Sequence, residues 1–282
     1  ALEKEIDELD KKTQNNINAV KSSVAALADK VGEPEALLSA GQDYVDIALE
    51  LIEKLKEFRP EMFCPGEKEN VLKVIAKAKN HIALSKDNIA NASNALSHGE
   101  EAFESAHKLY QDVVAAETLW QCKLELALEA LAAAECEIGS REKLVLKGFD
   151  ENGDEIDVEF DTNHWSEGSL EELKNQSKKI RDILTNKDEA KNLMLEDLDG
   201  ILDLANDIID DSEKIKNGAY IAIELSEKRA ELAEDLAEDL AEEAGLTVIK
   251  TEGYEGDDAR AANIIHLKNG ATGFEVVIIL KP

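Results

Sequence analysis

Several residue types that usually build catalytic sites and small cores are scarce in this chain. Aromatic residues make up 4% of the 282 residues, and only three cysteines are present. Cys64, Cys122 and Cys136 are an odd number without metal-ligand spacing, which argues against a disulfide framework and a zinc cluster. With few aromatics, the core must consist of Leu, Ile, Val and Ala, a composition that favours long packed helices.

Long apolar runs are missing as well. The longest, such as VVIIL at residues 276–280, are far shorter than the roughly 20 residues that a membrane-spanning helix requires. No signal peptide is recognisable. We therefore expect a soluble cytoplasmic protein, with secretion by a route without a classical signal as the alternative. A chain that starts inside a helical pattern at Ala1 is also compatible with a fragment of a larger protein.

Positive charge is scarce, and negative charge is abundant. The formal net charge is −30, and five of the 32 basic residues are arginines. A field of this sign repels phosphate backbones and anionic lipid surfaces, which argues against nucleic-acid and membrane-surface roles. Much of the charge lies between residues 188 and 245, with 19 acidic against five basic residues.

The dominant pattern in the chain is a seven-residue apolar periodicity. Apolar residues spaced alternately three and four apart recur in residues 2–27, 37–58, 71–96, 103–138 and 194–222. This spacing gives each helix one apolar stripe, as in coiled coils and bundles. Ala and Ser recur along the stripes, and such small residues favour close antiparallel packing within one chain.

Helix boundaries are indicated by capping residues. Pro34 suits the first position of a helix. Residues 97–100 (SHGE) and 169–172 (SLEE) have capping-box spacing, so we expect helices to begin there. A break near residues 185–189 should precede one long helix that continues to about Ala244.

Two stretches have the alternation of β-strands. Residues 142–161 alternate on both sides of DENGD, which predicts a hairpin, and residues 246–282 contain three further strand patterns. If the hairpin and the strands share a sheet, both preceding helices must deliver the chain to the same end. We expect one five-stranded sheet at one end of the bundle, because it leaves fewer backbone groups unpaired.

The predicted fold class is mainly α (α+β). It is an elongated antiparallel helical bundle or coiled coil with a small β-sheet cap formed by the hairpin and the three C-terminal strands. The expected segments are a four-helix bundle (1–139), the hairpin (140–165), a helical segment with one long acidic helix (166–245) and the C-terminal strands (246–282).

The acidic repeat AELAEDLAEDLAEEAG at residues 230–245 is explained by a single apolar stripe. Its leucines are four residues apart, so we expect them to be buried: Leu232, Leu236 and Leu240. The carboxylates between them should face water rather than form a site. These are Glu234, Asp235, Glu238 and Asp239.

Possible catalytic or metal-binding residues are isolated. Glu104 and His107 match the Glu-x-x-His step of carboxylate-bridged di-iron bundles, but no other histidine follows a glutamate at this spacing. A histidine at the edge of the helix seam is the favoured interpretation of His107. Gly153 is misplaced for a calcium-binding loop, and Cys64 has no evident activating partner. The sequence therefore predicts neither a catalytic set nor a cofactor.

The leading functional hypothesis is a non-enzymatic helical scaffold that acts through protein–protein contacts. Candidate binding residues are Tyr254 in a polar loop and a β edge formed by Val276, Val277, Ile278 and Ile279. Alternatively, a basic partner surface binds the acidic helix, and homo-oligomers are possible. Two other classes stay open: a secreted helical toxin or effector that remodels at membranes, and a carboxylate-rich metal enzyme around Glu104 and His107.

Overall fold

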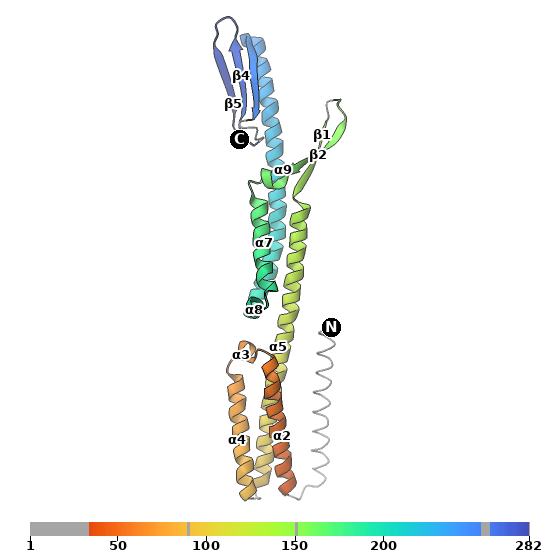
Figure 1. Cartoon of the computed structure of the whole chain (residues 1–282), viewed down its shortest axis with the longest axis vertical. Coiled ribbons are helices and arrows are strands. Elements are labelled where there is room, and N and C mark those ends of the chain that lie inside the picture. The colour runs from red at the N-terminus through yellow and green to blue at the C-terminus, as the bar shows by residue number, and fades with distance from the viewer. Residues whose placement is uncertain (1–33, 89–90, 150–151, 255–259, 282) are drawn as a thin grey trace. The chain divides into compact units, whose positions relative to one another are not determined.

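The protein is mainly helical and carries two small antiparallel sheets (Figure 1). A computed structural model describes residues 34–88, 91–149, 152–254 and 260–281. The helix predicted within residues 2–27 lies outside the described residues. The predicted mainly α fold class with a small β part is confirmed. The chain divides into two compact units, Ala1–Gln121 and Cys122–Pro282, and the boundary falls inside a helix.

The first unit is a helical bundle. Its elements are α2 (Pro34–Lys54), η1 (Leu55–Glu57), α3 (Pro60–Phe63), α4 (Glu67–Asp87) and the first part of α5 (Ala92–Ser140). Pro34 begins α2, as predicted. The core is aliphatic, as the composition requires, and includes the fully buried Val45, Leu55 and Val113.

The predicted helix boundary at residues 97–100 is wrong. Helix α4 ends at Asp87, and α5 begins at Ala92 and continues through Gly99. A Cβ atom at Gly99 would lie 2.5 Å from the carbonyl oxygen of Gly41 in α2. The backbones of α2 and α5 therefore touch at this point, and glycine is required for the close approach rather than for a helix end.

The second unit contains the later part of α5 and four further described helices. These are α6 (Thr162–Trp165), α7 (Ser169–Thr185), α8 (Lys187–Ala190) and α9 (Leu195–Ala244). Helix α9 has 50 residues, so the predicted long helix is confirmed, and α8 occupies the predicted break. Helix α7 begins at Ser169 as predicted but without a capping box, because the Ser169 hydroxyl donates to the Ser166 carbonyl at 2.7 Å.

Cross-helix ion pairs define the directions of α5, α7 and α9. Lys123 of α5 pairs with Asp199 near the start of α9 at 2.5 Å. Further along, Arg141 reaches Ser212 of α9, so α5 and α9 run parallel. Glu135 of α5 pairs with Arg181 late in α7 at 2.7 Å. Lys174, earlier in α7, pairs with Glu142 directly after α5 at 2.6 Å, so α7 runs antiparallel to α5 and α9.

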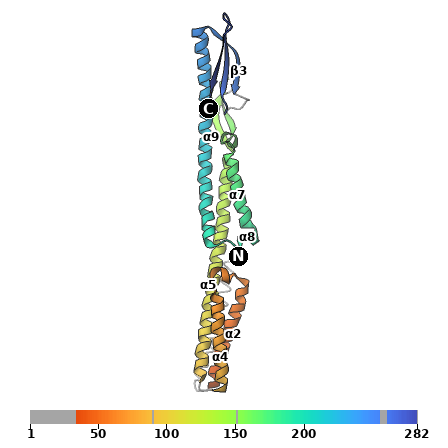
Figure 2. The ribbon, with the colours of Figure 1, turned by 90° about the vertical axis from the view of Figure 1, so that its left-hand side faces the viewer.

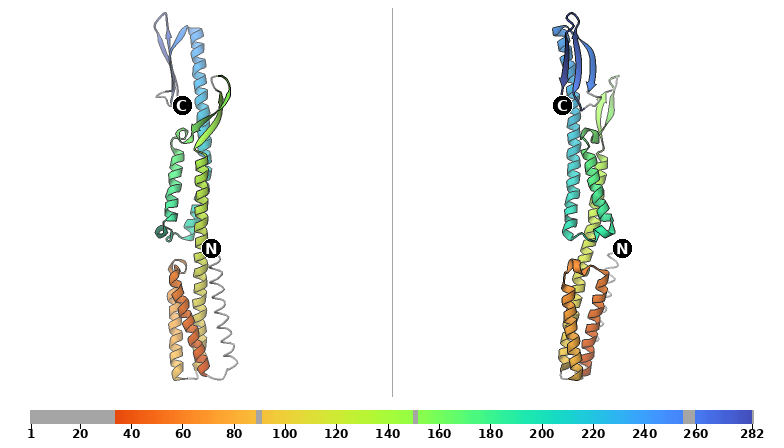
Figure 3. Two further views of the ribbon diagram at one scale, coloured as in Figure 1. Left: turned by 45° about the vertical axis from the view of Figure 1, so that its right-hand side comes forward. Right: turned by 60° about the vertical axis from the view of Figure 1, so that its left-hand side comes forward.

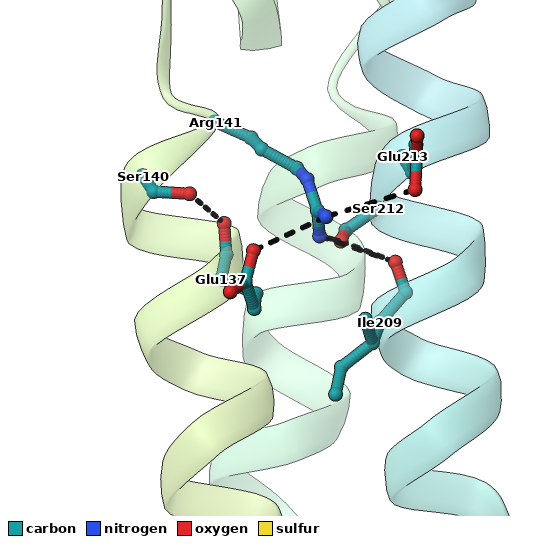
Figure 4. Close-up of polar contacts among 6 residues, drawn as sticks. All are labelled: Glu137, Ser140, Arg141, Ile209, Ser212 and Glu213. Atoms are coloured by element: carbon teal, nitrogen blue, oxygen red, sulfur yellow. Dashed lines mark hydrogen bonds and ion pairs between the residues drawn. The ribbon is translucent and has the colours of Figure 1, made fainter.

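Arg141 joins the end of α5 to α9 directly before the hairpin (Figure 4). Its guanidinium donates to the Ser212 hydroxyl and to the Ile209 carbonyl, the latter at 3.2 Å. It also pairs with Glu137 at 3.1 Å and lies 3.9 Å from Glu213. Because the Arg141 side chain is 12% exposed, this network holds the base of the hairpin against α9.

The described strands form two sheets rather than the single five-stranded sheet that was predicted. One sheet is the hairpin of β1 (Lys143–Phe149) and β2 (Glu155–Asp161). The other has the order β3-β4-β5 and contains β3 (Leu246–Tyr254), β4 (Asn263–Asn269) and β5 (Glu275–Leu280). All five strand predictions are confirmed, and their assembly into one sheet is wrong.

The two sheets are separate because each packs on its own part of α9. Leu144 of the hairpin clusters with Ala219 and Ile223. The three-stranded sheet clusters with Ala233 and Ala237 further along the helix. Their contacts with α9 therefore follow one another along the C-terminal half of the helix, that of the hairpin first (Figures 2 and 3).

The leucine stripe predicted for the acidic repeat is only partly right. Leu232 is 50% exposed, and Leu236 and Leu240 are half-buried, whereas Ala233 and Ala237 are 0% and 4% exposed. The small alanines are buried because the sheet packs closely on that side of α9. The four intervening carboxylates, Glu234, Asp235, Glu238 and Asp239, are exposed as predicted.

Candidate protein-interaction edge

Strand β5 forms one edge of the three-stranded sheet and alternates regularly between two environments. Val276, Ile278 and Leu280 are half-buried and pack toward α9. Val277 and Ile279 are 47% and 51% exposed on the outer face. The strand therefore has an apolar inner face that is held by α9 and an apolar outer face that is open to solvent.

The turn between β4 and β5 determines which backbone groups of β5 point away from the sheet. The Asn269 amide donates to the Phe274 carbonyl, and the Gly273 amide donates to Asn269, both at 2.8 Å. Gly273 adopts φ +75°, which glycine allows without strain. Bonded pairs alternate in an antiparallel ladder, so residues 276, 278 and 280 bond to β4. The amide and carbonyl groups of Glu275, Val277 and Ile279 consequently point outward.

The opposite edge of the same sheet is irregular. Strand β3 pairs with β4 with register shifts between Val248 and Lys250 and between Thr251 and Gly253. Such bulges twist a strand and disrupt its outward row of hydrogen-bonding groups, which discourages pairing with another chain. Strand β5 pairs with β4 without a shift from Glu275 to Leu280.

The hairpin edges are protected by charge instead. Lys143 pairs with Glu159 at 2.5 Å, and Lys147 pairs with Asp157 at 2.8 Å, across the solvent face of β1 and β2. Charged side chains on edge strands oppose addition of a further strand. Residues 276–280 contain no charged residue at all. Among the described strands, β5 is therefore the edge best suited to pairing.

The predicted binding residues have different environments in the structure. Val277 and Ile279 lie on the open face, while Val276 and Ile278 serve the contact with α9. Tyr254 is not in a loop, because its backbone ends β3 opposite Asn263, and its side chain lies outside the described residues. Its predicted role in binding stays a prediction.

The charged residues that flank β5 were not singled out from the sequence. Lys268 of β4 donates to Glu275 at 2.8 Å, and this hydrogen bond together with the lysine charge lowers the pKa of Glu275. Lys281 follows the strand directly and is exposed. A strand signal bounded by opposite charges could have drawn attention to Glu275 and Lys281.

The metal-binding candidates lie on α5 in the first unit. Glu104 is exposed, and the half-buried His107 stacks on Phe103 with ring centroids 5.6 Å apart. Within the described ranges, no group of three or more His, Cys, Asp or Glu side chains could hold a metal ion. That part of the chain therefore offers no further ligands for a centre built on Glu104 and His107.

The environment of Cys64 disfavours its thiolate. Burial raises the pKa of the Cys64 thiol, and the negative charges of Asp112 and Glu67 raise it further. A nucleophilic cysteine requires the opposite, a cationic neighbour that lowers the pKa. The geometry gives Cys64 a packing role after α3, where it lies against the apolar core of the first unit.

A surface depression lies where α6 meets α7 and is lined by Asn163, His164, Glu167 and Arg260. The Arg260 guanidinium donates to the His164 carbonyl at 2.7 Å, and the Asn163 side chain accepts from the Glu171 amide at 3.0 Å. These contacts hold the turn between α6 and α7 in place. The depression brings together no nucleophile and base.

None of the helices in the described ranges is both long enough and apolar enough to cross a membrane. Comparisons of the chain with protein-family models, with curated proteins and with solved structures find no match. A functional assignment therefore depends on the geometry of this molecule alone.

Proposed function

We propose that this protein is a non-enzymatic scaffold that binds protein partners by accepting an extended segment on the edge of β5. In this mode the partner adds a strand to the sheet, main-chain hydrogen bonds supply affinity, and alternate side chains supply specificity. The observation that carries the proposal is the contrast among edges: β5 is regular and carries no charged side chain from Val276 to Leu280, whereas β3 is bulged and the hairpin is charged.

The fold supports this use of β5 because it supplies a rigid platform. The inner face of the sheet rests on α9, with Leu267 fully buried and Ile265 2% exposed. An anchored strand loses little further conformational freedom on binding, so more of the interaction free energy contributes to affinity. The outer side chains of Val277 and Ile279 offer an apolar contact for every second residue of the added strand.

The environments of the polar groups are compatible with a binding role rather than catalysis. The thiol of Cys64 has a raised pKa, and the depression near Arg260 is held by structural hydrogen bonds. The exposed carboxylates of α9 follow the solvent side of the helix. Partner recognition by β5 requires none of these groups.

The test is affinity capture with the full chain and two variants at one position. Val277→Pro removes an amide donor that points away from the sheet, so it blocks strand addition and is tolerated by an edge strand. Val277→Thr keeps the amide, the β-branched shape and the strand preference, and is the matched control. Quantitative mass spectrometry should find partners that wild type and V277T retain and V277P loses. Partners captured equally by all three proteins would refute the proposal.

A further inference from the structure

We infer that the β5 edge accepts β5 of a second copy of this chain, antiparallel and centred on Ile278, which gives a continuous six-stranded sheet across a two-fold dimer. The inference rests on the proposed function, because it uses the same edge and names the partner. It follows from the self-complementarity of residues 275–281 in three independent respects: backbone phase, apolar contact and charge.

The positions of the outward-pointing amide and carbonyl groups along β5 allow this pairing. Outward amide and carbonyl groups belong to the odd-numbered residues Glu275, Val277 and Ile279, as the turn geometry requires. In a two-fold antiparallel pair centred on Ile278, Val277 lies opposite Ile279 of the second copy. Both residues have outward-pointing groups, so each such pair can exchange two main-chain hydrogen bonds.

The side chains select this register over its neighbours. Centred on Ile278, the pair places Glu275 opposite Lys281 and Val277 opposite Ile279. A pair centred on Val277 would place Glu275 opposite Ile279, and one centred on Ile279 would place Lys281 opposite Val277. Opposite charges and apolar pairs directly across a strand seam are each favourable. Of these three registers, the one centred on Ile278 matches every residue with a suitable partner.

The surroundings of β5 leave room for a second copy. In the described part of the chain, β5 makes its extensive contacts with β4 and, through its inner face, with α9, and no other element packs extensively on its outer edge. Figure 2 shows the three strands along one side of α9. A two-fold axis normal to the sheet would place the two α9 helices on the same face, each over its own strands. The inner side chains of Ile278 would then meet across the seam.

The charge of the chain predicts how this dimer responds to salt. Each copy carries a formal charge of −30, so long-range repulsion opposes association at low ionic strength. The centre of the seam consists of apolar and hydrogen-bonded contacts, which salt does not weaken, and the two Glu275–Lys281 pairs at its ends are few beside the charge of −30 on each copy. Screening by added salt should therefore strengthen the dimer. Dimers that depend on exposed ion pairs alone would respond in the opposite direction.

The first measurement is sedimentation of the full chain over about a hundredfold range of concentration, at low and at physiological salt. Wild type and V277T should move from monomer to dimer, with the dimer stronger at higher salt. V277P should stay monomeric while its circular dichroism matches wild type. A wild type that is monomeric throughout, or a dimer that V277P retains, would overturn the inference.

The second measurement tests the register with a charge cycle, which does not depend on how well a proline variant folds. Glu275→Lys and Lys281→Glu should each weaken the dimer by on the order of tenfold, because each places like charges across both ends of the seam. The double variant should recover most of the affinity. Glu275 also pairs with Lys268 within one copy, and the cycle cancels this effect because the pair is lost in E275K and in the double variant alike. A double variant no tighter than the singles would overturn the register and the inference with it.

The two proposals fail separately. If the chain is monomeric but V277P still loses a partner that V277T captures, the dimer inference fails and the proposed function stands. If V277P changes neither the oligomeric state nor the captured partners, both fail.

Discussion

The hairpin and the three-stranded sheet both pack on α9, but their solvent-exposed sides differ. Each buries one apolar face on α9, through Leu144 in the hairpin and through Leu267 in the sheet. The hairpin covers its solvent face with ion pairs such as Lys143 with Glu159. The sheet leaves Val277 and Ile279 open on β5.

This difference separates a structural β element from one that is suited to binding. Two-stranded hairpins have two free edges, and charge on both keeps them from pairing with other chains. The three-stranded sheet also has two free edges, and only the β3 edge is disrupted by bulges. The β5 edge lacks such protection, and it is therefore the candidate for strand addition.

The largest effect should come from proline at neighbouring positions of β5. Ile278→Pro removes an amide that bonds to β4 and leaves its acceptor unpaired, so we expect a loss of about 3 kcal/mol in the stability of the sheet, the upper end for an unpaired buried group. Val277→Pro removes an outward amide and should cost much less. Hydrogen exchange of the β4 amides, measured for both variants, reports this directly. Equal exchange in I278P and V277P would show that the assigned hydrogen-bond phase of β5 is wrong.

A smaller effect is expected where the hairpin meets α9. Leu144 is 4% exposed, and Leu144→Ala should cost about 2–3 kcal/mol, at the low end for such changes because the half-buried Leu146 and Phe160 can relax. Val145 lies on the other face and is 55% exposed, so Val145→Ala should cost well under 1 kcal/mol. Denaturant unfolding of the two variants provides the comparison. If V145A is as destabilising as L144A, the hairpin face has been assigned wrongly.

The smallest effect should follow from neutralising the carboxylates on the solvent side of α9 near its C-terminal end. Replacing Glu234, Asp235, Glu238 and Asp239 by Gln and Asn removes like-charge repulsion of a few tenths of a kcal/mol per pair. We expect unchanged or slightly raised stability in thermal unfolding, and a similar gain in wild type on adding salt. A quadruple variant that unfolds, or loses a partner that V277P retains, would identify these carboxylates as a binding site.

Much of the local structure could be predicted because the signals are local. The alternation around DENGD places β1 and β2 correctly, and the heptad phase carries α9 through Gly200 and Gly218. Val277 and Ile279 could be recognised as an apolar edge for the same reason. The capping box at residues 97–100 was predicted wrongly because Ser-x-x-Glu spacing also occurs inside a helix, where Gly99 allows the close approach of α2.

The sequence by itself determined most of the described helices, the five strands and the faces of the strands, since periodicities of about 3.6 and 2 residues depend only on backbone geometry. Only the tertiary structure decided that the five strands form two sheets, and that Ala233 and Ala237 rather than Leu232 are buried under the second one. It also decided which edge of that sheet stays regular. The physical reason is that contacts between residues far apart in the chain depend on distances of approach between whole elements. These distances are set by packing in three dimensions and leave no periodic trace in the sequence.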